Sequence, residues 1–176
     1  MFRTLIVQIL MIFVLLVGCE QGHPEKLLIR TWEASGFIPS HEMARLSKDP
    51  LPDGASMEMT YAGIQTYHLG NKYDGEATIT LRMRNDDQEI ALRFHMKDAG
   101  TWKLHGDTLV ETSEDSVVTP LDDRTKTLIS NMPELKASFT PVKGESTSSI
   151  IKHMSASTVE LELQNPKGLN ITLQKI

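Results

Sequence analysis

Hydrophobic and polar residues alternate along residues 76–97, and only Asn-Asp-Asp at 85–87 interrupts the alternation. A period of two puts alternate side chains on one face of a strand, so the pattern predicts two antiparallel strands, 76–84 and 89–97, joined by a turn. Pairing them gathers eight apolar residues on one face: Ala77, Ile79, Leu81, Met83, Ile90, Leu92, Phe94 and Met96. A lone hairpin is marginal in water, so further strands are expected to cover this face.

Weaker alternation on both sides predicts those further strands. They are expected at 27–37, 57–69, from 109 onward, and at 137–142, 149–154, 159–163 and 169–173. Inside 57–69 the apolar phase shifts at Ala62-Gly63, which predicts a bulge or a bend of the kind that a curved sheet needs. Asp98-Ala99-Gly100 and His105-Gly106-Asp107 are typical of turns. Trp102 lies between them and shares a face with Leu104, so it is expected to be buried beside the hairpin. Trp32, in the opening strand, is expected to be buried too.

One helix is predicted late in the chain. An aspartate at 122–123 can accept from the free N–H groups of a first turn, and apolar residues recur at Leu128, Met132 and Leu135 before an end near Pro133. Residues 38–56 are expected to form a long loop in which 41–48 make one or two helical turns. The sequence therefore predicts a mainly β antiparallel protein of about 8–10 strands with one inserted helix, closed as a barrel or split into a sandwich.

The amino terminus indicates export. An apolar run, Thr4–Gly18, follows Arg3, and at about 15 residues it is short for a membrane span of roughly 20. It ends in Leu-Val-Gly-Cys, which resembles a bacterial lipobox, and Cys19 is the only cysteine. We expect Cys19 to be acylated, with palmitate among its fatty acids, and to anchor the protein to a membrane facing the periplasm. Glu20 favours the outer membrane. The alternative is an uncleaved signal anchor.

The predicted organisation is a signal peptide at 1–18, a lipidated tether at 19–26 and one domain at 27–176. Cleavage removes one base, Arg3, from the 18 Lys and Arg and none of the 23 Asp and Glu, which leaves a net charge of about −6. A nucleic-acid partner is not expected for so acidic a chain.

The sequence offers little sign of catalysis. Six histidines are expected at the surface, because no two have ligand spacing on one element: His23, His41, His68, His95, His105 and His153. Acid pairs at 86–87 and 122–123 are explained by a turn and a helix cap. We therefore expect no catalytic residue, no metal and no cofactor, and rank an envelope hydrolase last among the hypotheses.

Methionines are frequent in the predicted elements: Met57, Met59, Met83, Met96, Met132 and Met154. Their flexible side chains suit ordinary core filling, which is the favoured interpretation, or an apolar chamber that adapts to an irregular ligand. On the second interpretation, the eight hairpin residues named above and Trp102 would line the chamber.

Several short segments resemble the ToxS group. They are Arg30-Thr31-Trp32, Leu51-Pro52-Asp53, Gly100-Thr101-Trp102-Lys103-Leu104, Gly106-Asp107-Thr108-Leu109 and Glu145-Ser146-Thr147-Ser148. The resemblance covers roughly residues 27–175. Members of that group are periplasmic partners of ToxR-type membrane-tethered transcription activators.

The resemblance implies a lipocalin-like barrel, stabilised by the periplasmic domain of such an activator, whose apolar chamber takes bile salts. The expected function is therefore a lipid-anchored accessory or regulatory protein and not an enzyme. The alternative is a stand-alone lipocalin-like envelope lipoprotein that binds a hydrophobic small molecule.

Overall fold

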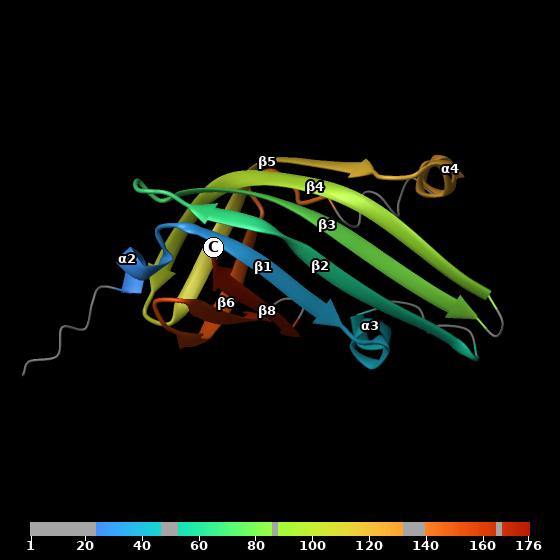
Figure 1. Cartoon of the computed structure of the whole chain (residues 1–176), viewed down its shortest axis with the longest axis horizontal. Helices are drawn as coiled ribbons and strands as arrows, with labels where there is room; N and C mark the ends of the chain where they lie inside the picture. The colour runs from blue at the N-terminus through green and yellow to red at the C-terminus, as the bar shows by residue number, and fades with distance from the viewer. Residues whose placement is uncertain (1–23, 47–52, 86–87, 132–139, 165–166) are drawn as a thin grey trace, which may run out of the picture.

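The computed structural model describes residues 24–46, 53–85, 88–131, 140–164 and 167–176 (Figure 1). Its elements, in chain order, are α2 (Pro24–Leu28), β1 (Thr31–Ile38), α3 (Ser40–Leu46), β2 (Ala55–Tyr67), β3 (Lys72–Asn85), β4 (Gln88–His105), β5 (Thr108–Pro120), α4 (Asp123–Asn131), β6 (Ser146–Met154), β7 (Thr158–Gln164) and β8 (Lys167–Lys175). The chain is mainly β, as the alternating patterns predict.

The eight strands form a closed barrel in sequence order. Every neighbouring pair is antiparallel, and β8 returns to β1, where Ala34 lies opposite Leu173. Closure gives every strand two neighbours, although β5 continues past its pairing with β6 and keeps an edge there. The prediction of a lipocalin-like antiparallel barrel is confirmed.

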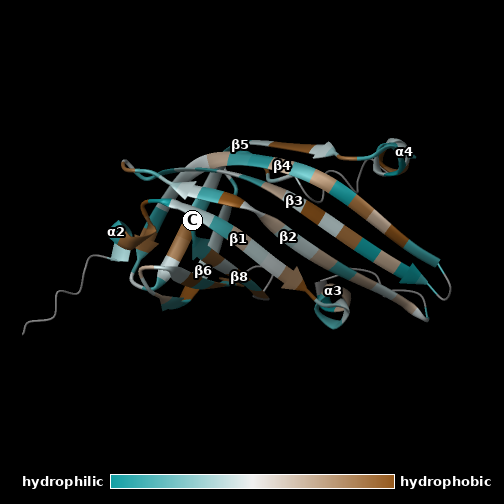
Figure 2. Cartoon of the chain, viewed as in Figure 1, coloured by the Kyte–Doolittle hydropathy of each residue, from teal (hydrophilic) through white to brown (hydrophobic). Residues whose placement is uncertain are grey.

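The central hairpin has the predicted register. Met83 lies opposite Ile90, and Leu81 opposite Leu92, so the apolar residues of both strands share the inner face. Apolar and polar residues alternate visibly along β2, β3 and β4 in Figure 2.

The strands differ in length, and this makes the two ends of the barrel unlike. β4 has 18 residues, whereas β7 has 7. β5 pairs with β6 only from Thr108 to Thr112, and beyond that β5 continues alongside β4 (Figure 1). The turns after β2, β4 and β6 lie at one end with α2, the closed end. The long strands reach past β6–β8 to the other end, the mouth, where α3 packs on β2 and α4 on β4 and β5.

Two apolar clusters fill the interior. The cluster at the closed end is built around Trp32, Tyr67 and Trp102, and the cluster toward the mouth around Ile79, Leu92 and Phe94. Trp32 is 0% exposed and Trp102 2%, which confirms that both are buried. The Trp32 indole donates to the Leu28 carbonyl oxygen at 2.9 Å, and the Trp102 indole to that of Lys72 at 3.1 Å.

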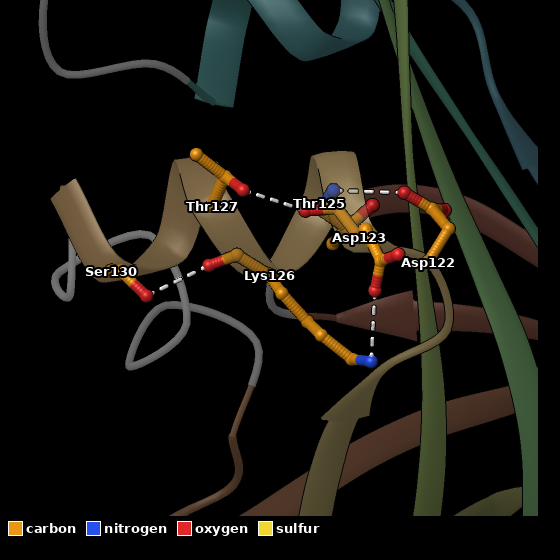
Figure 3. A network of polar contacts seen from close by, with 6 residues as sticks. All are labelled: Asp122, Asp123, Thr125, Lys126, Thr127 and Ser130. Carbon is orange, nitrogen blue, oxygen red and sulfur yellow. Dashed lines mark hydrogen bonds and ion pairs between the residues drawn. The ribbon is translucent and has the colours of Figure 1, made fainter.

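The predicted late helix is α4, and its aspartate cap is confirmed. The Asp122 carboxylate accepts from the Thr125 backbone N–H at 2.8 Å, and this bond lowers the pKa of Asp122 (Figure 3). Thr125 is buried, and its hydroxyl accepts from the Arg93 backbone N–H at 3.1 Å, which joins the start of α4 to β4.

Two predictions about the strands are wrong. The phase shift and bulge predicted at Ala62-Gly63 are absent, because the register of β2 is unbroken there, Gly63 keeps the inward phase and Ile64 faces out. Asp98-Ala99-Gly100 is not a turn, because β4 continues through it to His105. The irregularity there lies on β5, where Asp115 is opposite Ala99, Ser113 is opposite Gly100, and the residue between them has no partner. Both errors have one cause: the inner face is polar or lacks a side chain at these positions.

The opening segment also differs from its prediction. Pro24–Leu28 is helical, so the tether expected to reach residue 26 gives way to structure at Pro24, and the first strand begins at Thr31 rather than 27. Residues 140–142 are not in a strand. The helical turns expected at 41–48 are confirmed as α3.

Several predictions fall outside the described residues. They concern the signal peptide, Cys19, His23, the loop residues 47–52, the turn residues 86–87, Met132 and its helix end, residues 137–139 and the turn residues 165–166. Within the described ranges, no helix has the length and apolar character needed to cross a bilayer.

Candidate functional site

A polar network lies inside the barrel, in the half nearer the closed end. Four adjacent strands contribute its side chains, which are Gln65 and Tyr67 from β2, Tyr73 from β3, Asp98 from β4, and Glu111 and Ser113 from β5. Each occupies an inward position of its strand. A polar set in an apolar interior must be hydrogen-bonded to be tolerated, and these contacts supply the bonds.

Glu111 is the first centre of the network. Its Oε1 atom accepts from the Tyr67 hydroxyl at 3.0 Å and from the Gln65 amide nitrogen at 3.1 Å. The Tyr67 ring packs edge-on against Trp102, with 5.6 Å between the ring centroids. The carboxylate is therefore held by groups that are themselves fixed in the core.

The pKa of Glu111 is raised from 4.5 to about 7. Burial is the main cause, because it removes water from the charged form. The hydrogen bond from Tyr67 opposes the rise, and the charge of Asp98 adds to it. Glu111 in turn helps raise the pKa of Tyr61 to about 12, where burial is again the largest cause.

Asp98 is the second centre. Its two oxygens accept one bond each at 2.6 Å, Oδ2 from the Tyr73 hydroxyl and Oδ1 from the Ser113 hydroxyl. Burial and the bond to Asp98 raise the pKa of Tyr73, so this phenol stays a donor. Opposite Asp98 in the register, Ser116 has a buried hydroxyl oxygen without a hydrogen-bond partner among the described residues. An unsatisfied hydroxyl is costly, by about 1–3 kcal/mol, unless water or a ligand meets it.

Glycines make room for the network. A Cβ atom on Gly75 would lie 2.2 Å from the Gln65 side-chain oxygen. A Cβ on Gly100 would lie 2.0 Å from the backbone oxygen of Thr112 and 3.0 Å from the Tyr73 ring. Both contacts are closer than real Cβ atoms come, so larger residues at these positions would displace the polar side chains or the strand.

Two cavities meet at Glu111. The larger, about 220 Å³, lies where β5 parts from β6 and is lined by Tyr73, Asp98, Glu111, Ser113, Thr140, Pro141, Glu145 and Thr147. The smaller, about 60 Å³, lies deeper among Ala34, Tyr61, Gln65, Tyr67, Glu111, Leu161, Ile171 and Leu173. Glu111 thus separates a polar entrance from a mostly apolar interior.

The predicted chamber residues all face the interior, but they do not line these two cavities. Ala77, Ile79, Leu81, Leu92 and Phe94 are buried, and Met83, Ile90 and Met96 are partly buried in the cluster toward the mouth. Trp102 belongs to the other cluster, at the closed end. Side chains from β1, α3, β5 and α4 pack over the mouth cluster, and a third cavity of about 290 Å³ remains at its rim, beside Met57, Met83 and Ile90.

The sequence reasoning missed the polar network because it followed apolar positions only. A signal was present in β5, where Glu111 has the same phase as the buried Leu109. Another was present in β4, where Asp98 has the phase of both Phe94 and Trp102. An acid in phase with core residues on each of two adjacent strands predicts a buried polar pair.

No cation of the described residues balances the two acids, since neither Asp98 nor Glu111 forms an ion pair with a described Lys, Arg or His. Likewise, in the described ranges no three His, Cys, Asp or Glu side chains are grouped to hold a metal ion. Of the described histidines, His95 is partly buried and the other four are exposed, close to the expected surface placement.

Comparison with known proteins adds no identity: no family model matches the chain, and no curated protein matches it. The geometry itself shows what the network can do. Asp98 and Glu111 accept hydrogen bonds from hydroxyl or amine groups, Tyr67 and Tyr73 hold them in place, and Glu111 exchanges its proton near neutral pH.

Proposed function

We propose that this is a lipid-anchored, non-enzymatic protein of the cell envelope that binds an amphiphilic small molecule inside its barrel. The observation that supports this most directly is the placement of Glu111, which lies on both the polar entrance cavity and the deeper apolar one. An amphiphile needs such a boundary, with acceptors for its hydroxyl groups on one side and apolar surface on the other.

A bile salt is the amphiphile that the resemblance to the ToxS group suggests. Its ring hydroxyls can donate to Asp98 and Glu111, whereas its own anionic group must stay at the solvent side, because a third carboxylate beside two acids is unfavourable. The entrance cavity, about 220 Å³, is smaller than the roughly 300–1,000 Å³ of ordinary ligand pockets. Side chains must therefore move before a sterol-sized molecule enters.

Calorimetry on the lipid-free domain with deoxycholate, below its micelle concentration, tests this proposal. The wild-type domain is expected to give a binding heat that saturates with one deoxycholate per protein. The double variant Asp98→Asn/Glu111→Gln is expected to bind deoxycholate at least several-fold more weakly. Glu33→Gln, an exposed residue on the outer face of β1, is the matched control. Equal binding by all variants would remove the network from the site.

A second function is favoured by the exposed edge of β5. The Ser113 backbone bonds to Glu145 and Gly144, and past Ser113 β5 has no paired strand on its outer side among the described residues. On the other side, Val117 pairs with Lys97 of β4. Such an edge accepts a strand from another protein through backbone hydrogen bonds. We therefore propose that the periplasmic domain of a ToxR-type activator adds here, and that its binding widens the entrance cavity next to the edge.

The partner proposal is tested by co-purification of the two periplasmic domains. Val117→Lys puts a charge on the edge strand, where the valine is 54% exposed, and is expected to lower the yield of complex. Phe37→Lys changes a phenylalanine that is 51% exposed on the outer face of β1, which neighbours β2 and β8 and not β5, and should leave the yield unchanged. The same loss with both variants would refute docking at the β5 edge.

A further inference from the structure

Hydrogen bonds link neighbouring segments at the closed end of the barrel. The Arg30 guanidinium donates to the Ala156 carbonyl at 2.7 Å, and the Trp102 backbone N–H donates to the Asn71 carbonyl at 2.9 Å. The Ile151 backbone N–H similarly reaches the Asp107 carbonyl at 2.8 Å. Each of the turns after β2, β4 and β6 is thus bonded to a neighbouring segment, and the three turns lie at one end of the barrel with α2 (Figure 1).

The chain enters the barrel at this face. Leu28 of α2 is fully buried, and its carbonyl accepts from the Trp32 indole, so the start of the fold is held in place. Pro24 follows Cys19 by only five positions in the sequence. Even fully extended, this stretch spans about 18 Å at most, since a residue covers roughly 3.3–3.6 Å.

An apolar residue projects from this face. Leu69 is 81% exposed at the tip of the β2–β3 turn, where Gly70 and Asn71 take left-handed conformations with φ of 80° and 62°. This backbone geometry fixes the turn, so the exposure of Leu69 reflects a defined conformation. The carboxyl-terminal Ile176 is 69% exposed near the same end.

Charged groups around the turn suit a phospholipid surface. Lys26, Lys103 and Lys175 are exposed at or near this end, and within the described part of the chain none of them forms an ion pair. Counted in the same way, the exposed acids are Glu25 and Asp107 in α2 and the turns, and Asp74 and Glu114 in the adjoining strands, where Glu114 pairs with the exposed Lys72. The four bases and four acids named here balance, in a chain whose net charge is −5. A balanced end avoids the repulsion that a net negative face would meet at an anionic bilayer.

We infer that the closed end of the barrel lies on the bilayer that holds the lipid anchor, with Leu69 in the headgroup region and the mouth directed away from the membrane. The inference rests on the proposed acylation of Cys19. One leucine offers too little apolar surface to bind a membrane alone. The lipid anchor, however, keeps the β2–β3 turn at a high effective concentration next to the bilayer, so even a weak contact between Leu69 and the headgroups forms for much of the time. β4 has 18 residues and a contour length of about 60 Å, and although it curves around the barrel it carries the mouth, with its rim cavity, away from the closed end (Figure 1).

The experiment uses the full acylated chain in vesicles of phosphatidylethanolamine and phosphatidylglycerol that carry a headgroup quencher. Because acylation uses the Cys19 thiol, a single new cysteine can be labelled with a fluorophore. Leu69→Cys and Asp107→Cys, at the closed end, are expected to be quenched several-fold more than Asn85→Cys at the mouth. Adding Leu69→Asp to Asp107→Cys is expected to reduce the quenching of that label.

Failure of the anchor and failure of the orientation give different results. If the chain takes up no palmitate and does not float with the vesicles, the anchor is absent. The proposed acylation of Cys19 and the proposed orientation are then both refuted. If it is acylated and floats, but labels at 69, 107 and 85 are quenched equally or 85 is quenched most, the anchor stands and the orientation is refuted. Unchanged quenching with Leu69→Asp would remove Leu69 from the contact.

Discussion

Glu111→Gln should change how the stability of the domain depends on pH. Glutamine has nearly the size of glutamate and keeps an oxygen that can accept from Tyr67 and Gln65, but it cannot ionise. The substitution therefore removes one titration while leaving the surroundings of the side chain largely intact.

The sign of the effect follows from the raised pKa of Glu111, about 7 in the folded chain against 4.5 for a free glutamate. Below about pH 4.5 the carboxyl is protonated in both the folded and the unfolded chain, so its favourable contribution is complete. Between pH 4.5 and 7 the unfolded chain loses the proton while the folded chain keeps it, which favours unfolding. Stability is lost as the pH rises through 7.

The size of the loss follows from the separation of the two pKa values. At about 1.4 kcal/mol per pH unit, the interval from 4.5 to about 7 corresponds to roughly 3 kcal/mol of unfolding free energy. That is a large share of the roughly 5–15 kcal/mol by which a folded domain is typically stable.

Urea unfolding, followed by the fluorescence of the two buried tryptophans, measures this from about pH 4 to about pH 8. The unfolding free energy of Glu111→Gln minus that of the wild type should rise by roughly 3 kcal/mol across this range, and that of the exposed Glu33→Gln control should stay flat. A flat difference for Glu111→Gln would show that Glu111 is ionised normally in the folded chain, and the buried network would be refuted.

Other substitutions test separate parts of the account. Trp102→Ala should lower the unfolding free energy by about 3–5 kcal/mol in denaturant titrations, because it empties a buried site, and free access of iodide to the tryptophans would contradict this. Gly100→Ala should destabilise the barrel and shift its melting temperature downward, since its Cβ would meet backbone; an unchanged melting curve would contradict the close approach. Ala77→Leu or Met83→Phe should change the unfolding free energy by less than about 3 kcal/mol. If the mouth cluster opens to admit the ligand, the same substitutions should weaken deoxycholate binding in calorimetry, and unchanged binding would place the ligand elsewhere. Cys19→Ser should abolish palmitate labelling and leave the precursor uncleaved, whereas a wild-type chain without label would indicate an ordinary signal or anchor.

The sequence correctly predicts the parts of the fold in which apolar side chains face the interior and polar side chains face the solvent. The strands around Leu81 and Leu92 alternate without a break, so both their register and their buried face are correct. The late helix is correct at its start because the Asp122 cap is a local interaction. The closure of β1 against β8 depends on residues far apart in the chain, and the sequence leaves barrel and sandwich as alternatives.

The errors fall where inward positions are polar or small. Gly63 and Gln65 face the interior. Because neither is apolar, the sequence suggested that the inward-facing positions had shifted to Ile64. Asp98 and Gly100 suggested a turn, yet one belongs to the buried network and the other packs against the next strand. Following the apolar positions alone passed over Glu111 and Asp98, although both are in phase with core residues, and the candidate site was found through the structure.

An amide NMR titration of the lipid-free domain with deoxycholate, alone and with an activator's periplasmic domain, tests the proposed binding site most directly. The account predicts saturable shifts concentrated at Gln65, Asp98 and Glu111, with tighter binding when the partner occupies the β5 edge. Shifts confined to the outer surface, or no shifts in either state while the barrel stays folded, would contradict binding inside the barrel.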